Sequence, residues 1–321
     1  MKEKEEYKVL QSQTPMVSVA MITYGHEAYI KQAIEGVLMQ QCDFELELII
    51  ANDCSPDNTD SVVQDILDNH PRGKWIKYTK HESNKGMMPN FVWSLGQCKG
   101  KYIAFCEGDD YWIDSLKLQK QVDFLEKNIE YVMCFTDRNI LIMPSVKAEE
   151  TSFLHQEREK SFTFKDIPFM SPTLTRVFKN IDLPKDNIIW NDTVHLTWIS
   201  NYGKIMYLKE KTAVYRETGN GAWTSLNDLE KGKHLIITRL NSMKVAPRLL
   251  KFKLNLISSK MILRLWIENY PYSKSEITQI PMSKYLLLIL EMDNIFMIKL
   301  LNFFICKTLN LYAFILKSKY I

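Results

Sequence analysis

The sequence lacks the cysteine and histidine spacings that build zinc sites. Its six cysteines lie far apart, form no CxxC pair and are expected to be buried, reduced thiols. Reduced thiols indicate a cytoplasmic protein, because the cytoplasm keeps cysteines reduced. Residues 1–15 are charged and hold no apolar run that could act as a secretory signal, so we expect a flexible N-terminal stretch and no export.

An excess of either charge is also absent. The 41 Lys and Arg against 38 Asp and Glu leave a formal net charge of +3, which argues against a nucleic-acid-binding protein. Glycine and proline, at eleven each, are too few for a collagen-like or low-complexity chain. The 46% hydrophobic and 25% charged content is that of a globular protein, and 321 residues suffice for one large domain with an appendage or for two unequal domains.

The two common glycine-rich phosphate-binding motifs are missing as well. No GxGxxG follows the first predicted strand and GxxxxGK[ST] occurs nowhere, which disfavours nicotinamide-dependent dehydrogenases and P-loop NTPases. The loop after that strand reads instead Thr23-Tyr24-Gly25-His26. A sheet that binds a diphosphate without a glycine-rich loop requires a cation to neutralise the phosphates.

What the sequence does contain is an alternation of short, β-branched apolar runs with longer amphipathic stretches. The predicted strands are residues 17–22, 46–51, 75–79, 102–106, 131–136, 204–208 and 213–215, and the predicted helices are 28–39, 59–69, 89–97, 115–127 and 193–202. This order predicts an α/β fold with a Rossmann-like, mostly parallel sheet flanked by helices. Residues 137–190 are less regular, and their polar middle, 147–165, is expected to form a surface loop or an irregular lid.

The composition changes at about residue 230. Residues 231–267 hold nine Lys and Arg and no Asp or Glu, and the apolar stretch 285–317 is interrupted by Glu291, Asp293, Lys299 and Lys307. A membrane-spanning helix needs about 20 nearly uncharged apolar residues, so a span is not expected. We divide the chain into residues 1–15, a domain over 16–230 and a C-terminal helical appendage over 231–321, which either lies on an anionic membrane surface or packs on the core.

Acidic residues follow two predicted strands directly. Asp53 ends one such segment, and Glu107, Asp109 and Asp110 follow another. Because the carboxyl ends of parallel strands meet at one edge of a sheet, these acids are expected to lie near each other, where ligands bind. Three carboxylates within four residues repel one another unless a cation compensates, so Glu107, Asp109 and Asp110 are candidate ligands of Mg²⁺ or Mn²⁺ held together with substrate phosphates. The alternative for such a turn is a helix N-cap or a solvated loop.

Four segments, taken in their order and spacing, resemble the family 2 inverting glycosyltransferases with the GT-A fold. They read VSVAMITYGHEAYIKQAIEGVLMQ from residue 17, LELIIANDCSPDNT from 46, YIAFCEGDDYWID from 102 and WNDTVHLTWISNYGKIMYLKEKTAVYRETG from 190. The resemblance covers about residues 16–225. It implies transfer of a sugar from a nucleotide-sugar donor, a UDP-sugar, to an acceptor hydroxyl with inversion. The implied acceptor is a glycan or lipid-linked glycan in surface polysaccharide synthesis, at the inner face of the membrane.

The resemblance also implies roles for residues of the donor site. Thr23 and Tyr24 correspond to residues that line the nucleotide pocket, and Asp53 to the residue that hydrogen-bonds the base, uracil. The segment from 107 to 110 corresponds to the acidic motif that binds the metal and the ribose, with Glu107 standing where the family usually has Asp. Lys85 lies in a turn, Asn84-Lys85-Gly86, that either faces the nucleotide or is a plain turn.

The catalytic base implied by the resemblance is Asp192. The family usually has a Glu-Asp pair at this place, and Asn191 precedes Asp192 here. Tyr215-Arg216 resembles the family's YR motif, which implies that Arg216 contacts the donor. The histidine that often follows two residues later is Thr218 in this chain.

Two other functions remain open from the sequence. A sugar-phosphate nucleotidyltransferase would share the α/β fold and the metal-bound carboxylates, but its glycine-rich, arginine-bearing loop is absent near the first strand. A non-catalytic membrane-surface protein with a decayed transferase domain is the other alternative. His26 and His195 are expected to be surface or packing residues, since neither has a partner at metal-ligand spacing. The segment 171–176 resembles an acceptor-side strand, which gives Arg176 a claim to substrate contact.

Overall fold

The computed structural model describes residues 14–143, 147–149, 158–169, 171–184, 188, 190–218, 226–251, 253–254 and 257. The chain divides into two compact units, residues 1–225 and 226–321, and each is described by itself. The predicted flexible stretch lies almost wholly outside the described residues. The apolar segment 285–317 also lies outside them.

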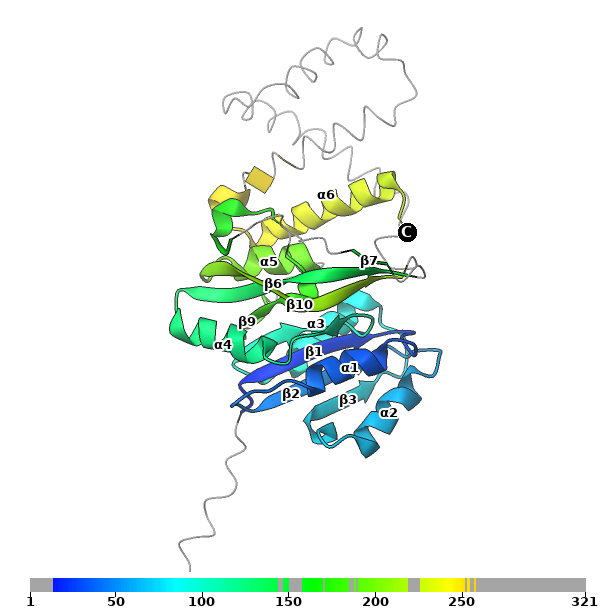
Figure 1. Cartoon of the computed structure of the whole chain (residues 1–321). Helices are drawn as coiled ribbons and strands as arrows, with labels where there is room; N and C mark the ends of the chain where they lie inside the picture. The colour runs from blue at the N-terminus through cyan, green and yellow to red at the C-terminus, as the bar shows by residue number, and fades with distance from the viewer. Residues whose placement is uncertain are drawn as a thin grey trace, which may run out of the picture. The chain divides into compact units, whose positions relative to one another are not determined.

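The first half of unit 1 is a parallel sheet. Its strands are β1 (Val17–Thr23), β2 (Leu46–Asn52), β3 (Ile76–Lys80) and β4 (Tyr102–Phe105), in the spatial order β3-β2-β1-β4 (Figure 1). All neighbours in this order run parallel, as the alternating sequence predicts. Strands β1, β2 and β4 are almost entirely buried, which agrees with their near-continuous apolar sequence.

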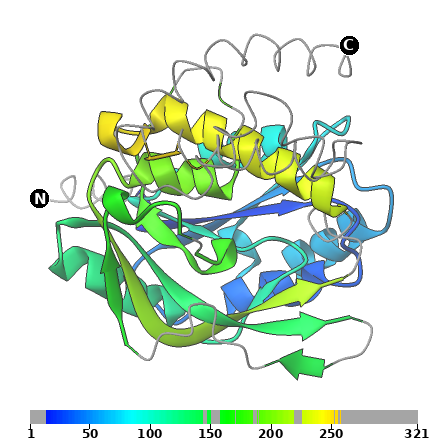
Figure 2. The same cartoon turned by 90° about the horizontal axis from the view of Figure 1, so that it is seen from above.

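Helices cover both faces of these strands. They are α1 (Ile30–Leu38), α2 (Thr59–Asn69) and α3 (Met87–Gln97). α1 and α2 pack together on one face, whereas α3 packs on β1 and β2 from the other (Figures 1 and 2). The switch of face occurs where the chain returns from β3 across the sheet to β4, as right-handed crossovers require.

The second half of unit 1 adds strands of both directions, so the sheet is mixed. β4 pairs with antiparallel β9 (Val177–Lys179), which pairs with β6 (Tyr131–Ile142). β6 runs parallel to β10 (Lys204–Glu217). The short strands β5 (Tyr111–Trp112), β7 (Lys147–Glu149) and β8 (Lys160–Phe162) join antiparallel. The 3₁₀ turns are Gly73–Trp75, Phe164–Asp166 and Thr173–Thr175, and the remaining helices of unit 1 are α4 (Lys117–Lys127) and α5 (Asp192–Ile199).

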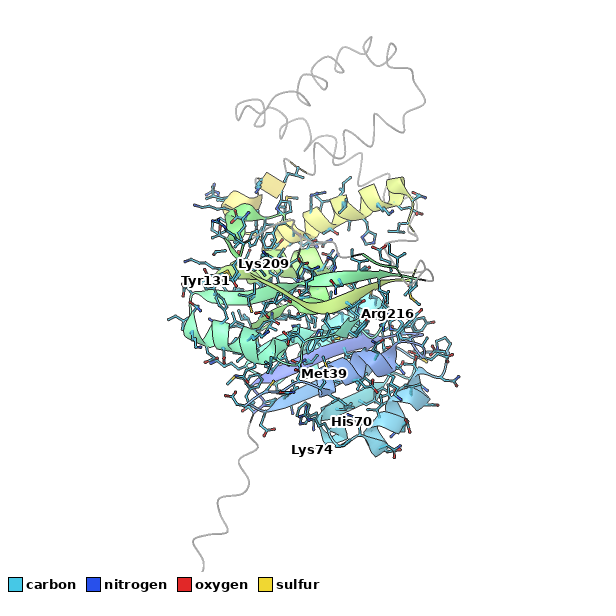
Figure 3. The ribbon with its side chains drawn as sticks, in the orientation of Figure 1. Met39, His70, Lys74, Tyr131, Lys209 and Arg216 are labelled. Atoms are coloured by element: carbon cyan, nitrogen blue, oxygen red, sulfur yellow. The ribbon has the colours of Figure 1, made fainter. Side chains whose placement is uncertain are left out.

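β10 is one long strand where the sequence predicts two. Its pairing with β6 changes register between Tyr207 and Ala213, at the place where the predicted strands are separated. β6 also continues to Ile142, beyond its predicted end. Figure 3 labels Tyr131 at the amino end of β6 and Arg216 near the carboxyl end of β10, at opposite ends of the sheet.

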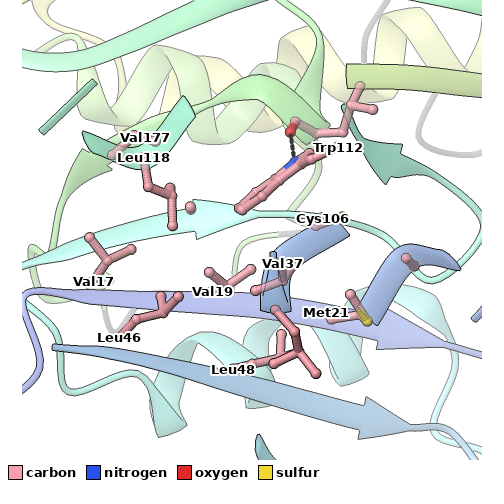
Figure 4. Close-up of a cluster of buried hydrophobic side chains, with 14 of the residues drawn as sticks. Val17, Val19, Met21, Val37, Leu46, Leu48, Cys106, Trp112, Leu118 and Val177 are labelled. Carbon is pink, nitrogen blue, oxygen red and sulfur yellow. Dashed lines mark hydrogen bonds between the residues drawn. The ribbon is translucent and has the colours of Figure 1, made fainter. Parts of the chain in front are cut away.

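The core lies between β1, β2 and the elements that cross them. Val17, Val19 and Met21 on one side of β1 pack with Leu46 and Leu48 of β2 (Figure 4). Each fully buried side chain of this kind stabilises the fold by roughly 1.5–3 kcal/mol. The indole N–H of Trp112 donates to the carbonyl oxygen of Leu174 at 2.8 Å, so the ring adds no unpaired donor to the core. This packing holds the carboxyl ends of the central strands in fixed register.

The cysteines that the structure describes are all free thiols. Cys98, Cys106 and Cys134 are buried, as the sequence predicts, whereas Cys42 and Cys54 are only partly buried. Burial raises the pKa of Cys98 to about 12, so this thiol stays protonated at neutral pH. Cys306 lies outside the described residues.

Unit 2 begins with α6 (Asp228–Val245), whose first turn is closed by a capping box. The Asn227 side chain accepts from the backbone N–H of Glu230, and the Glu230 carboxylate accepts from the backbone N–H of Asn227. In the part of the chain that the structure describes, none of the helices has both the length and the hydropathy for crossing a membrane.

Candidate functional site

The carboxyl ends of β1, β2 and β4 are joined by backbone hydrogen bonds. The Asp53 N–H donates to the Thr23 carbonyl oxygen at 2.9 Å, and the Gly108 N–H donates to the Ile22 carbonyl oxygen at 3.0 Å. Asp53 and the turn formed by residues 107–110, which we call the acidic turn, therefore flank the end of β1. This adjacency is the one that the parallel-strand argument predicts for residues more than fifty positions apart.

The acidic turn lies directly against Thr23 and His26. A Cβ atom on Gly108 would be 2.8 Å from Thr23 Oγ1 and 3.0 Å from His26 Nδ1, closer than such contacts allow. Glycine is therefore required at 108 by the close approach of the turn. Thr23 Oγ1, His26 Nδ1 and Glu107 Oε2 are all buried without a hydrogen-bond partner. Buried polar atoms are rarely left unpaired, so Thr23 Oγ1 and His26 Nδ1, which both lie beside Gly108, indicate a place for a ligand.

The three acids of the turn differ in their surroundings. Burial, and next the charge of Asp109, raise the pKa of Glu107 to about 7. Burial and the neighbouring acids raise the pKa of Asp110 well above its ordinary range, although the backbone N–H of Arg216 donates to its Oδ1 at 2.8 Å. The Asp109 side chain remains one-third exposed. Ionising all three acids at once is therefore unfavourable unless a cation binds beside them.

Arg216 holds the acidic turn in place. Its guanidinium donates to the carbonyl oxygen of Asp109 and to the side-chain oxygen of Gln32. It also stacks on Tyr111 and Tyr29, with its central carbon 4.3 and 5.1 Å from the ring centroids. These contacts are all with protein groups, and the predicted contact of Arg216 with the donor stays a prediction.

Asp53 holds the turn that contains Lys85. Its side chain is 2% exposed, and its two carboxylate oxygens accept from the backbone N–H groups of Lys85 at 2.8 Å and Gly86 at 2.9 Å. Gly86 has a φ of +88°, a conformation that favours glycine. The side chains of Tyr24 and Lys85 are exposed at this edge. The hydrogen bond that a base is predicted to donate to the Asp53 carboxylate stays a prediction.

Asp192 is the first residue of α5. Asn191 caps this helix, because its side chain accepts from the backbone N–H groups of Thr193 and Val194. The Asp192 side chain is exposed, and its Oδ1 accepts from the Thr193 N–H at 2.9 Å. Asn191, which stands where the resemblance expects an acid, thus has a structural role as the N-cap.

Arg176 connects α5 to the acidic turn. It is 1% exposed, and its guanidinium donates to the Asp192 carbonyl oxygen at 2.9 Å and to Ser171 Oγ and O at 2.9 and 2.8 Å. The charges of Asp192 and Glu107 both raise the pKa of Arg176, against the larger effect of burial, and Asp192 also raises the pKa of Glu107. The carboxylates of residues 192 and 107 therefore lie within electrostatic reach of one another.

Two residues of this site, His26 and Arg176, make contacts that the sequence does not predict. His26, expected at the surface or in packing, has a buried Nδ1 beside the acidic turn. Arg176 donates a hydrogen bond to the first residue of α5, and no pattern in the sequence predicts this contact. His195 is buried among Phe105, Phe178 and Trp198, which agrees with the expected packing role.

The residues of the acidic turn can hold a divalent ion only if a bound ligand supplies further coordinating atoms. Among the described residues, no three His, Cys, Asp or Glu side chains converge closely enough to hold an ion. Mg²⁺ in phosphate-transfer sites commonly takes one or two protein carboxylates and completes its coordination with substrate phosphates and water. The exposed Asp109 carboxylate and the unpartnered Glu107 Oε2 suit such a shared site.

The sequence matches the family described as glycosyl transferase family 2 over residues 18–182, just over half of the chain. This chain belongs to glycosyl transferase family 2. The predicted family membership is thereby confirmed.

An uncharacterized protein of Mycobacterium tuberculosis, Rv1520, is 31% identical over 214 residues, which cover 65% of this glycosyltransferase and 61% of Rv1520. The putative teichuronic acid biosynthesis glycosyltransferase TuaG of Bacillus subtilis is 29% identical over 153 residues, 47% of this chain and 56% of TuaG. The chain therefore spans less than two thirds of the length of either relative.

Solved structures share the fold of this glycosyltransferase. S. aureus TarS 1-349 in complex with UDP-GlcNAc aligns with a TM-score of 0.56 at 16% identity, over 84% of this chain and 78% of that one. The mannosyltransferase PcManGT of Pyrobaculum calidifontis, in complex with GDP-Man and Mn²⁺, aligns with a TM-score of 0.52 at 13% identity, over 87% and 86%. The predicted GT-A type of α/β fold is confirmed.

Proposed function

We propose that this family 2 glycosyltransferase transfers a sugar from a UDP-sugar to an acceptor hydroxyl with inversion. The observation that carries the proposal is that the exposed Asp192 carboxylate stands within electrostatic reach of Glu107, at the edge where Thr23 and Asp53 also lie. A proton acceptor and a donor-binding edge are the two parts that such a transfer needs.

The donor lies, in this proposal, between Asp53 and the acidic turn. The exposed ring of Tyr24 offers a stacking surface for a base, and Asp53 and Lys85 lie beside it in the loops that follow β2 and β3. TarS is known in complex with UDP and with UDP-GlcNAc, which supports UDP as the nucleotide. PcManGT binds GDP-Man, so a GDP-sugar is the comparison that the experiment must include.

The chemistry assigned to Asp192 is that of a general base. Its carboxylate takes the proton of the acceptor hydroxyl while that oxygen attacks the anomeric carbon from the side opposite the leaving group, and one displacement inverts the configuration. Asn191 and Arg176 fix the backbone at the start of α5, which limits the positions that the Asp192 carboxylate can take. Asp109, with Glu107 and Asp110 beside it, would hold a Mg²⁺ or Mn²⁺ ion that neutralises charge on the nucleoside diphosphate.

We further propose that the protein is cytoplasmic and acts at an anionic membrane surface on a glycan or lipid-linked glycan. TuaG, named for teichuronic acid biosynthesis, supports a role in surface polysaccharide synthesis. The basic residues of the region after 230 support the membrane contact, because anionic lipids attract Lys and Arg.

The proposed activity is tested by UDP release. The full chain is incubated with Mn²⁺ and single UDP-sugars or GDP-sugars, with and without glycan acceptors, and released nucleoside diphosphate is measured. We expect release from at least one UDP-sugar. Pyrophosphate formation from UTP and a sugar 1-phosphate would instead identify a nucleotidyltransferase, and no turnover in any mixture would favour a decayed enzyme.

A further inference from the structure

We propose that His26 is a phosphate-contacting residue of the donor site, whose imidazole hydrogen-bonds the diphosphate of the nucleotide sugar. The inference rests on the proposed function, since it presumes a nucleoside diphosphate at this edge. His26 lies in the loop after β1, three residues past Thr23, on the side that the acidic turn covers.

The first argument is that polar atoms of this loop are left without partners. Thr23 Oγ1 and His26 Nδ1 both lie against Gly108, and neither has a hydrogen-bond partner. Thr23 is 2% exposed, so water from the bulk does not satisfy its hydroxyl. Leaving a buried polar atom unpaired costs roughly 1–3 kcal/mol, and two such atoms at one contact point to a polar ligand.

The second argument is that the backbone of the loop is already committed. The N–H groups of Gly25, His26 and Glu27 donate to side-chain oxygens of Ser55, Thr59 and Asp57 at 3.0, 2.9 and 3.0 Å. These three acceptors lie in the loop after β2 and in the first residue of α2. Loops that cradle phosphates usually do so with free backbone N–H groups. Here these three are occupied and are not available to a phosphate, which leaves side chains such as that of His26 as donors in this part of the loop.

The third argument is the position of His26 beside the exposed acid. Its Nε2 is 3.9 Å from Asp109 Oδ2, too far for a hydrogen bond between them. An imidazole carries an N–H in either tautomer and can donate to a phosphate oxygen. Asp109 is also the acid that would hold the proposed divalent ion, which would supply neutralising charge to the same diphosphate. The guanidinium of Arg216, the nearby arginine, is engaged by Asp109 and Gln32.

The test separates phosphate contact from every other role of the ring. Affinities of the full-length protein for uridine and UDP, and for guanosine and GDP, are measured by calorimetry with and without Mn²⁺. His26→Phe keeps the ring and removes both nitrogens, and His26→Asn keeps a hydrogen-bonding atom near the position of Nδ1. We expect His26→Phe to weaken UDP binding about 10-fold and uridine binding less than about 2-fold, with His26→Asn between the wild type and His26→Phe.

The matched control is His70→Phe, which removes an imidazole at the other end of α2 and is expected to leave UDP affinity unchanged. Unchanged UDP affinity in a folded His26→Phe overturns the inference, and so does an equal loss for uridine and UDP, which would assign the ring to the ribose or the base. If His26→Phe does not fold, His26→Asn decides by the same comparison. Wild-type protein that binds neither UDP nor GDP would instead overturn the proposed function itself.

Discussion

The guanidinium of Arg176 donates a hydrogen bond to the backbone carbonyl oxygen of Asp192 at 2.9 Å. The same side chain holds Ser171 by two further hydrogen bonds and is almost completely buried. A buried guanidinium is costly unless it is fully paired, and this one is within electrostatic reach of the negative charges of Asp192 and Glu107. Arg176 therefore holds the start of α5, and under the proposed function it is a positioning residue that acts through the placement of Asp192.

Replacing Arg176 by Met is expected to lower kcat by about 10-fold or more while the KM for the donor changes little, because the start of α5 loses its support. The variant should also lose about 2–3 kcal/mol of stability, since Ser171 and the Asp192 carbonyl are left unpaired. Steady-state kinetics and urea unfolding measure the two effects. Arg176→Lys, which keeps the charge, should recover part of kcat, and an equal rise in KM would contradict the positioning role.

Asp192→Asn is expected to reduce turnover by about 100-fold to 10,000-fold, because the amide cannot accept the proton of the acceptor hydroxyl. The amide oxygen can still accept from the Thr193 N–H, so α5 should begin at the same residue. UDP affinity, measured by calorimetry, should stay within about 2-fold, since the substitution spares the donor site. Asn191→Asp is the control, because Asp also caps helices well, and an undiminished rate in Asp192→Asn would remove this residue from the role of base.

Three strands of the parallel half of the sheet, β1, β2 and β4, could be predicted because they are apolar along most of their length. A strand buried on both faces leaves a continuous run of β-branched residues, which a sequence shows directly. β5, β7, β8 and β9 have only two or three residues each, too few for any periodicity, and they were not predicted. Their pairing depends on contacts made by distant parts of the chain.

The candidate site, like the sheet, is only partly predictable from the sequence. The nearness of Asp53 to the acidic turn follows from strand direction, which the sequence predicts. The hydrogen bonds of Asp53 with the turn after β3, and of Arg216 with the turn after β4, depend on loop geometry that no local pattern specifies. Loop conformations of this kind depend on the whole fold. The sequence therefore indicates Asp53 and Arg216 as candidate site residues but does not predict their hydrogen-bond partners.

Binding to anionic vesicles should depend on the basic residues of the region after 230. The full chain is expected to sediment with phosphatidylserine-containing vesicles and less so with neutral ones. Raising the salt concentration should release it, because each Lys or Arg near the surface contributes about 1 kcal/mol of screened attraction. Substituting Lys231, Lys244 and Lys251 by Gln should weaken binding, whereas the same substitutions at Lys74, Lys77 and Lys101 serve as the control. Vesicle binding that changes neither with the salt concentration nor with the charge of the vesicles would contradict the proposal.

The buried Lys117 should give stability a distinctive pH dependence. Burial lowers the pKa of its amine to about 7, and its Nζ lies over the ring of Trp112 and donates to Gln121 Oε1 at 2.6 Å. Because the unfolded chain binds this proton up to a much higher pH, the folded state becomes more stable as pH rises above 7. The gain should be about 2 kcal/mol between pH 7 and 8.5.

Urea unfolding at several pH values in this window measures that slope, which Lys117→Met should remove. Glu107 opposes this slope only slightly, because its raised pKa of about 7 places most of its effect on the pH dependence of stability between about pH 4.5 and 7. The control is Lys120→Met on the same helix, where the lysine is exposed and paired with Asp114 and Glu210, and the slope should persist. The same slope in Lys117→Met and wild type would show that another group titrates.

Cys54, which follows Asp53 in the loop after β2, has a strained backbone conformation. Its φ is +61°, a left-handed conformation that costs a residue with a Cβ atom roughly 1–2 kcal/mol, and its thiol makes only one long contact, 3.7 Å to the Glu82 carbonyl oxygen. Cys54→Gly should therefore stabilise the protein by about 0.5–1 kcal/mol, because the relief of strain exceeds the added freedom of the unfolded chain. Urea unfolding at pH 7 measures the change. Cys54→Ala keeps the Cβ atom and should give no gain, so equal stability of the two variants would show that the strain is not released by removing the side chain.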